Sequence, residues 1–265
     1  MSVLMGRARC ISLWSMAVEP GIHFSEAATP PGMRIYAVGD IHGRYDLLTE
    51  MHRRIMAEIL RDRPDDWRII YPGDYSDRGP ASRQVLDFLS GSIATEPRVM
   101  AIAGNHDIGF LAFLDQPQAS GIFANYGGDA TARSYGVDID FSSREGLMRG
   151  HAELVKAVPE EHKHLLHTLK LSVTLGDFFF SHAGIRPGVP LEEQSSGDLV
   201  WIRECFRDYR ELHPKLIVHG HTPVPAPEIM PNRVNLDTGA YYTGRLTGMM
   251  FEGKQKRLME VTAGG

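Results

Sequence analysis

The sequence is poor in cysteine and contains no long apolar run. Cys10 and Cys205 are its two cysteines in 265 residues, and neither belongs to the paired C-x-x-C spacing of a zinc or redox site. This count excludes a disulfide framework and favours a cytoplasmic protein. No apolar run approaches the ~18–20 residues that cross a bilayer, so we expect no membrane partner.

Positive charge is not in excess either. The chain has 28 Lys+Arg against 33 Asp+Glu, which gives a formal net charge of -5. A mildly acidic chain without a basic stripe has no global attraction to polyanions, so we expect no nucleic acid partner, and a nuclease is disfavoured. An anionic substrate would have to be held by local charge. The chain does have 12 histidines, which raise the question of a metal site.

The first 32 residues show neither the period of a strand nor that of a helix. Their short apolar stretch at 10–18 is a poor match to a secretion signal. A Thr-Pro-Pro-Gly sequence then breaks the chain. We therefore predict a poorly structured arm over 1–32, followed by one domain over 33–265.

Three strand–loop–helix units follow this arm. β-Branched and aromatic runs predict strands at 33–38, 68–71 and 98–101, each ending in a polar loop that contains glycine. Helical spacing of apolar residues follows at 44–63, at 81–89 and from residue 108 onward. This alternation predicts right-handed βαβ units and a largely parallel sheet, with functional groups at the carboxyl ends of the strands.

The middle of the chain has a different character. The segment 116–170 contains Asn125-Tyr126-Gly127-Gly128 and then two short helical segments, which predict an inserted helical cap. After it, expected strands at 171–175 and 178–181 flank Gly176-Asp177, a signal for a tight hairpin. Further strands are expected at 216–218, 235–239 and 246–251.

Side chains that bind metals or transfer protons follow the expected strands. Any one of them alone is more often a turn residue, a helix cap or a packed histidine. Five such loops in one chain are a much stronger signal, because a sheet brings the ends of its strands together. The residues expected to converge are Asp40, His42, Asp74, Asp77, Asn105, His106, His182 and His221.

This convergence predicts a site for two divalent metal ions. Carboxylate and amide oxygens with imidazole nitrogens, and no thiolate, suit manganese, iron or zinc. Two divalent ions bring more positive charge than two ligand carboxylates remove, so a phosphate dianion would be attracted there. The same ions would lower the pKa of a bridging water and give a nucleophile near neutral pH.

Three ordered motifs resemble the signatures of the phosphoprotein phosphatase family of calcineurin-like metallophosphoesterases. They are Gly39-Asp40-Ile41-His42-Gly43, Gly73-Asp74-Tyr75-Ser76-Asp77-Arg78-Gly79 and Gly104-Asn105-His106-Asp107. His182-Ala183-Gly184 and Gly220-His221-Thr222 are similar to the later metal-binding loops of that family. The resemblance covers roughly 34–251. It implies an α/β fold in which two mixed β-sheets pack as a sandwich flanked by helices, with a small helical cap over about 116–170.

The resemblance also implies a role for each residue. Asp40 and His42 would bind the first metal, Asp74 would bridge both metals, and Asn105, His182 and His221 would complete the second. His106 would protonate the leaving oxygen with support from Asp77, while Arg78 and Arg203 would bind phosphate oxygens. The implied reaction is in-line attack of a metal-bound hydroxide on phosphorus, with manganese as the first choice of metal.

Two departures bear on the position of the chain in the family: the one at Asp107 is typical of bacterial members, and the one after His221 favours the phosphoprotein phosphatase branch. Eukaryotic protein phosphatases of the family carry Glu at the position of Asp107, whereas Asn-His-Asp is usual in symmetrical diadenosine tetraphosphate hydrolases and other bacterial members. Thr222-Pro223 follows His221 where more distant metallophosphoesterases have a second histidine. His219 has no counterpart in these motifs and receives no role.

The leading hypothesis is a phosphatase of phosphomonoesters that acts on phosphoserine and phosphothreonine in proteins. The alternative is a bis(5'-nucleosyl)-tetraphosphatase, which would hydrolyse diadenosine tetraphosphate with the same metals. A dinucleotide needs aromatic or arginine stacking surfaces in the cap, and Tyr126, Tyr135 and Phe123 are candidates. A catalytically inactive phosphoprotein-binding module would lack a ligand or the acid, and none is missing.

Overall fold

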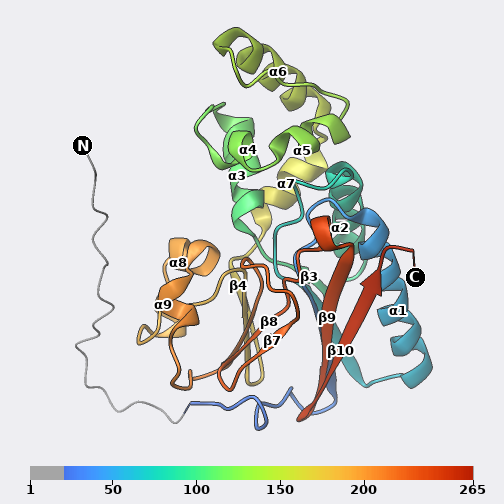
Figure 1. Ribbon diagram of the computed structural model, residues 1–265. Helices are drawn as coiled ribbons and strands as arrows, with labels where there is room; N and C mark the ends of the chain where they lie inside the picture. Colours follow the sequence, from blue (N-terminus) through green and yellow to red (C-terminus); the bar gives the residue numbers. More distant parts are fainter. Residues whose placement is uncertain (1–20, 265) are drawn as a thin grey trace.

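Two mixed β-sheets pack face to face in the computed structural model, which describes residues 21–264 (Figure 1). In the first sheet the strand order is β10 (Gln255–Thr262), β9 (Arg245–Glu252), β1 (Met33–Val38), β2 (Asp66–Tyr71) and β3 (Val99–Ala101). In the second it is β4 (Ser172–Leu175), β5 (Phe178–Ser181), β6 (Leu216–His219), β8 (Arg233–Asn235) and β7 (Glu228–Ile229). The predicted fold class, α/β with two mixed sheets, is confirmed.

The alternation of side chains along β1 explains the layers. Ile35 and Ala37 belong to the apolar core between the sheets, together with residues such as Phe178 of β5. Tyr36 and Val38 belong to the second core, under the helices. Successive residues of a strand point to opposite faces, so β1 contributes to both cores and is buried on both sides.

The expectation of one largely parallel sheet is wrong in part. β1, β2 and β3 are parallel, but β9 pairs antiparallel with both β1 and β10. β10 is an edge strand in which only Met259 and Val261 are buried, so its sequence carries a weak apolar pattern. The strand expected at 235–239 is also misplaced, because β8 spans Arg233–Asn235 and a loop follows.

Three helices follow the first three strands. They are α1 (Tyr45–Asp62), α2 (Ser82–Thr95) and α3 (Asn105–Asp115). α1 ends at Asp62, and the residue after it, Arg63, has a left-handed φ of 51° and precedes Pro64. α3 begins at Asn105 rather than at 108, so the Asn-His-Asp motif lies in the first turn of this helix.

Four helices of the predicted cap segment follow α3. They are α4 (Ile122–Asn125), α5 (Gly128–Ser134), α6 (Arg144–Ala157) and α7 (Glu160–Thr168), and Figure 1 shows α4, α5 and α6 beyond one end of the sheets. Aromatic stacking joins this segment to α3, since the rings of Phe113 and Phe123 lie 4.4 Å apart. A second contact runs from Tyr135 through His162 to Asp87 of α2, with distances of 2.8 and 2.9 Å. The segment is therefore fastened to the helices beside the sheets.

Residues 21–32, which the sequence predicts to be part of the arm, make defined contacts. The amide nitrogens of Ile22 and Phe24 donate to the carbonyl oxygens of His213 and Pro231 at 2.8 and 2.7 Å. Ala27 is fully buried in the core between the sheets. The structure differs from the prediction for this part, and residues 1–20 lie outside the described residues. Between 21 and 264 no helix is long and apolar enough to cross a membrane.

His213 is buried among aromatic rings. Its imidazole stacks on Phe206 and Tyr209, with ring centroids 5.6 and 5.0 Å apart. Burial, reinforced by the positive charge of Arg233, lowers the pKa of His213 from 6.5 to about 4. The unfolded chain therefore binds this proton more readily than the folded chain, and protein stability should fall as the pH drops from 6.5 toward 4.

We expect His213→Phe to reduce this loss of stability. A neutral ring of similar shape keeps the stacking, and one pKa unit corresponds to about 1.4 kcal/mol, so up to about 3 kcal/mol of the pH dependence would disappear. Urea unfolding at several pH values from 7 to 4 would measure it. His164→Phe, on the exposed surface of α7, is the matched control. An unchanged pH dependence in His213→Phe would contradict the assignment.

Candidate metal centre

The six predicted metal ligands meet at the ends of strands from both sheets. Asp40 and His42 follow β1, Asp74 follows β2, Asn105 opens α3 after β3, and His182 and His221 follow β5 and β6. All six side chains are buried, with at most 5% of their surface exposed. β1, β2 and β3 are parallel to one another, and β5 is parallel to β6, so their carboxyl ends lie at common edges.

Asp74 lies at the middle of this group. Its Oδ2 is 3.3 Å from Nε2 of His42, and its Oδ1 is 3.3 Å from Nε2 of His182. Each carboxylate oxygen thus faces a different histidine. The side chains around Asp74 form two sets, His42–Asp74–His106 and Asp74–His182–His221, and in each the potential ligand atoms lie within 4.8 Å of one another.

Asn105 joins two of the histidines. Its Oδ1 is 2.9 Å from Nε2 of His182 and 2.8 Å from Nδ1 of His221. Asp40 adjoins the same group, because its Oδ2 accepts a hydrogen bond from the amide nitrogen of His221 at 2.9 Å. One carboxamide oxygen, two imidazoles and the carboxylate of Asp74 therefore converge on a small volume.

Backbone carbonyl groups fix the orientation of two imidazoles. Nδ1 of His42 is 2.8 Å from the carbonyl oxygen of Ser76, and Nδ1 of His182 is 3.0 Å from that of Pro72. A carbonyl oxygen can only accept, so Nδ1 is the donor in both rings and Nε2 is directed at Asp74. Metal-binding histidines are typically held in this way by a partner behind the ring.

The charges of the group suit divalent cations. Asp40, Asp74 and Asp237 are buried carboxylates, and Oδ1 of Asp40 has no hydrogen-bond partner. Burial, with repulsion from Asp237 and Asp74, raises the pKa of Asp40 well above its usual range. Burial alone would lower the pKa of His182, but attraction to Asp74 and Asp40 outweighs it and raises that pKa to about 9. Buried anions that need positive charge, next to imidazole nitrogens, fit the donor set of a metal centre.

Unusual backbone angles concentrate at this site. Among residues 21–264, six residues other than glycine have a positive φ, and one of them is the helix terminus Arg63. The other five are His42, Asp74, Asp77, Arg78 and His221, with φ between 44° and 69°. Such angles cost free energy for side chains with a Cβ and persist where the surrounding structure enforces them. The loops are thus bent in a way that aims these side chains at the site.

His106 and Asp77 form a buried pair beside the ligands. Nδ1 of His106 lies 2.7 Å from Oδ2 of Asp77. The hydroxyl of Thr131, from α5, donates to Oδ1 of Asp77 at 2.9 Å and accepts from the Asp77 amide nitrogen at 2.8 Å. The cap segment therefore positions the carboxylate of Asp77, which in turn orients His106. The sequence assigns Thr131 no role of its own.

Asp107 ties the ligand loops together. Its carboxylate accepts hydrogen bonds from the amide nitrogens of Asp74, Tyr75 and Gly104 at 2.8 to 2.9 Å. The loop after β2 and the first turn of α3 are therefore cross-linked by one buried side chain. Asp107, the residue at which Asn-His-Asp differs from Asn-His-Glu, therefore has a structural role.

Two arginines approach the histidines from outside. Arg78 directs Nη1 at Nε2 of His42 and Nη2 at Nε2 of His106, at 3.1 and 2.9 Å. Arg203 donates from Nε to Nε2 of His221 at 3.1 Å. Both arginines expected to bind phosphate are thus at the site. Tyr241 was not predicted, and the guanidinium of Arg78 lies over its ring at 4.8 Å.

Asp237 is a further site residue that sequence reasoning missed. It is 2% exposed, and after burial it is the main cause of the raised pKa of Asp40. The sequence predicts a strand here, but Asp237 lies in the loop between β8 and α10 (Ala240–Thr243). This loop continues to Gly239, so it repeats the pattern of strand, aspartate and glycine seen at Asp40 and Asp74. That pattern could have identified it.

Three other residues singled out in the sequence lie in the packed interior. His219 is 1% exposed and packs edge to face on Phe206, so it belongs to the core. Phe123 and Tyr135, candidates for base stacking, are 1% and 6% exposed. They pack with other rings of the cap and cannot stack on a ligand, whereas Tyr126 is 61% exposed.

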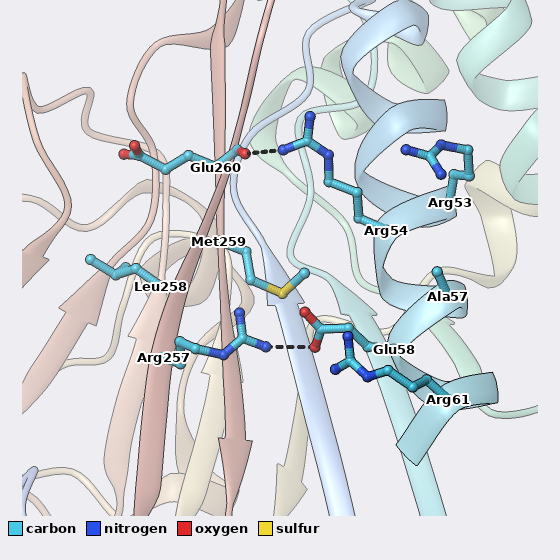
Figure 2. Close-up of a pocket in the computed structure, with 9 residues that line it drawn as sticks. All are labelled: Arg53, Arg54, Ala57, Glu58, Arg61, Arg257, Leu258, Met259 and Glu260. Atoms are coloured by element: carbon cyan, nitrogen blue, oxygen red, sulfur yellow. Dashed lines mark hydrogen bonds and ion pairs between the residues drawn. The ribbon is translucent and has the colours of Figure 1, made fainter. Parts of the chain in front are cut away.

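A groove of about 400 Å³ between α1 and β10 is lined by none of these site residues (Figure 2). Its arginines are engaged with the protein. Arg54 donates to the carbonyl oxygen of Glu260 at 3.0 Å, and Arg257 forms an ion pair with Glu58. Arg53 and Arg61 pair with neighbouring carboxylates on α1. The groove therefore offers little unpaired positive charge to a phosphate.

Gly220 leaves the space that Asp40 needs. A Cβ at position 220 would lie 1.8 Å from Oδ1 of Asp40. We expect Gly220→Ala to displace this carboxylate and to weaken metal binding by about 10–100-fold, as the loss of a group that orients a ligand does. Calorimetric titration with manganese would measure the change.

Gly91→Ala is the matched control, because a Cβ there meets nothing within 4 Å and the residue lies in α2. It should leave metal affinity unchanged and stabilise the helix by up to about 1 kcal/mol. Equal manganese affinity in Gly220→Ala and wild type would show that Asp40 does not bind the metal.

A two-sheet fold with carboxylates, histidines and an asparagine at the strand ends defines the class of dinuclear metallohydrolases. The model of the calcineurin-like phosphoesterase family matches residues 33–244, and the chain belongs to this family. Members of the family use a dinuclear metal site.

Two proteins from Bacillus species are similar to this chain over most of its length. The asymmetrical bis(5'-nucleosyl)-tetraphosphatase PrpE of Bacillus subtilis strain 168 is 27% identical over 233 residues, which cover 81% of this chain and 89% of that protein. PrpE of Bacillus velezensis is 26% identical over 231 residues, covering 81% and 87%.

Solved structures share the fold. A protein thought to be a diadenosine tetraphosphatase superposes with a TM-score of 0.61 at 19% identity, covering 90% of this chain and all of that one. A serine/threonine protein phosphatase of Saccharomyces cerevisiae gives 0.54 at 13% identity, covering 91% and 86%.

Proposed function

We propose that the protein hydrolyses dinucleoside polyphosphates, as a bis(5'-nucleosyl)-tetraphosphatase does. The observation that carries the proposal is the similarity to PrpE proteins of that name over four-fifths of the chain. The leading hypothesis from the sequence, a serine/threonine phosphoprotein phosphatase, has no equivalent support, because the phosphatase structure at 13% identity shares the fold alone. The proposed substrate is therefore a small phosphoanhydride rather than a protein.

The positions of the donor atoms support the metal ligands that the family resemblance implies. Asp40 and His42 would hold one ion, Asn105, His182 and His221 the other, and Asp74 would serve both, since its two oxygens face His42 and His182. We propose manganese as the native ion. When bound, two divalent ions supply water activation and neutralise charge on the transferring phosphoryl group.

Protein groups around this centre would handle the proton and the phosphate charge. His106 is the group that would donate a proton, from Nε2, to the leaving oxygen, and Asp77 at Nδ1 would stabilise its charged form. Arg78 and Arg203 would turn from the histidines to the phosphate oxygens, which bind guanidinium groups more strongly than neutral imidazoles do.

The decisive experiment compares two substrates with the purified protein and manganese. We expect kcat/KM for diadenosine tetraphosphate to exceed that for a phosphoserine peptide by at least about tenfold, a difference of about 1.4 kcal/mol. Chelation of the metal should abolish both activities, and manganese should restore them. A clear preference for the phosphopeptide would refute the proposal and return the phosphoprotein phosphatase to first place.

A further inference from the structure

Two exposed aromatic side chains, Trp201 and Tyr242, lie next to rings of the metal centre. Between residues 21 and 264, four aromatic side chains are at least 38% exposed, namely Tyr45, Tyr126, Trp201 and Tyr242. Tyr45 starts α1 directly after the His42 loop, and Tyr126 precedes Gly127, whose carbonyl accepts from the Arg78 amide. Single exposed aromatics need no explanation, but two that adjoin the rings around one metal centre indicate a binding surface.

Trp201 lies on the side of the second metal set. It is the last residue of α8 (Ser196–Trp201), and it is 47% exposed. Its ring meets that of His221 edge to face, with centroids 6.0 Å apart. Arg203 contacts the same imidazole at 3.1 Å. A large open aromatic surface and a phosphate-binding candidate thus adjoin one histidine.

Tyr242 lies on the side of the first metal set. Its ring meets that of Tyr241 at 4.8 Å, and Tyr241 in turn meets His42 at 5.4 Å. Arg78 lies over the ring of Tyr241, so that ring is already engaged, whereas Tyr242 is 58% exposed. The Tyr242 ring is held against Gly239, where a Cβ would lie 2.1 Å from it.

The two aromatic residues approach the centre from different sides of Asp74. Tyr242 contacts Tyr241, Tyr241 contacts His42, and His42 faces Oδ2 of Asp74. Trp201 reaches the centre through His221, which shares Asn105 with the histidine that faces Oδ1. A dinucleoside polyphosphate has the matching chemistry, with a flat base at each end of a phosphate chain.

We propose that Trp201 and Tyr242 each stack on one nucleobase of a dinucleoside polyphosphate whose phosphate chain lies over the metal centre. The substrate class rests on the proposed function, while the stacking is a separate property of these side chains. Stacking on an aromatic ring tolerates any base, because every base has a π face. We therefore expect the two side chains to increase the affinity for a ligand with two bases without selecting which bases these are.

Equilibrium binding can distinguish the contribution of the bases to affinity from that of the phosphates. Titrations with manganese on a His106→Asn background, which limits turnover, would use diadenosine tetraphosphate, ATP and inorganic tripolyphosphate. We expect Kd to rise in that order, because the ligands carry two, one and no bases. Trp201→Ala and Tyr242→Ala should each weaken diadenosine tetraphosphate about tenfold more than tripolyphosphate, within the ~5–150-fold range of base stacking on an aromatic side chain.

Conservative and distant variants complete the design. Trp201→Phe keeps a stacking face and should retain most of the affinity for diadenosine tetraphosphate. Leu60→Ala, at a position on α1 that is 70% exposed, should change no Kd. The stacking proposal is overturned if the three ligands bind equally to the parent protein, or if each alanine variant weakens diadenosine tetraphosphate and tripolyphosphate alike. Preference for a phosphopeptide in turnover would instead overturn the proposed function and leave these binding results standing.

Discussion

Replacing His106 with asparagine is expected to lower kcat by about 10²–10⁴-fold, the usual contribution of a positioned general acid. The side chain is 2% exposed, and its Nδ1 is held 2.7 Å from Oδ2 of Asp77. Nε2 faces Arg78 at 2.9 Å, on the side where phosphate oxygens would bind. Asparagine retains a hydrogen-bond donor at this position but cannot release a proton, so leaving groups that need protonation should suffer most.

The dependence on the leaving group makes this prediction specific. His106→Asn should affect an alkyl phosphate, whose leaving alkoxide is strongly basic, far more than para-nitrophenyl phosphate, whose leaving group is weakly basic. Asp77→Asn should show the same ranking with a smaller loss, because the imidazole would remain but lose its carboxylate partner. An equal loss for both substrates, or wild-type kcat in His106→Asn, would exclude His106 as the acid.

The sequence predicted the elements that build the site because their signals are local. Met33–Val38 matches β1 residue for residue, and Gly176-Asp177 marks the turn between β4 and β5. The division into two mixed sheets did not follow from the βαβ pattern and came from the resemblance. Strand pairing such as that of β1 with β9 joins residues about two hundred positions apart, and periodicity carries no information about such contacts.

The ligand set was predictable for a different reason. Glycines flank Asp40, Asp74 and His221, and they mark loops where the backbone must turn sharply or approach another chain segment closely. The sequence alone does not mark Asp237 as a site residue, because the pattern over 235–239 predicts a closing strand. The aromatic surroundings were predicted least well, since the cap residues Phe123 and Tyr135 turned inward. Whether an aromatic side chain faces a core or a ligand depends on packing between distant segments.

Asp74→Asn is expected to cause a large loss of both activity and bound metal. Among residues 21–264, this carboxylate is the one group whose oxygens face both sets of histidines, at 3.3 Å from His42 and from His182. An amide offers only one oxygen and no charge, so the variant would lose the anion shared between the two ions. Metal ions contribute several kcal/mol to transition-state stabilisation, so we expect kcat/KM to fall by at least about 10³-fold. Metal content should fall from about two ions per chain to one or none.

Asp129→Asn is the matched control, since this aspartate is half exposed on α5 and pairs with Arg133. It should retain both metals and full activity, because an exposed ion pair contributes about 0–1 kcal/mol to stability.

Thermal unfolding distinguishes a variant that has lost the metal site from one that no longer folds. Added manganese should raise the Tm of wild type and of Asp129→Asn, and raise that of Asp74→Asn much less. Burial alone would raise the pKa of Asp74, but attraction to His182 and His106 outweighs it and holds that pKa well below its usual range. The folded apo protein therefore favours the Asp74 carboxylate, and apo Asp74→Asn should be less stable than apo wild type at neutral pH. Equal stabilisation of both proteins by manganese would mean that Asp74 is not the shared ligand.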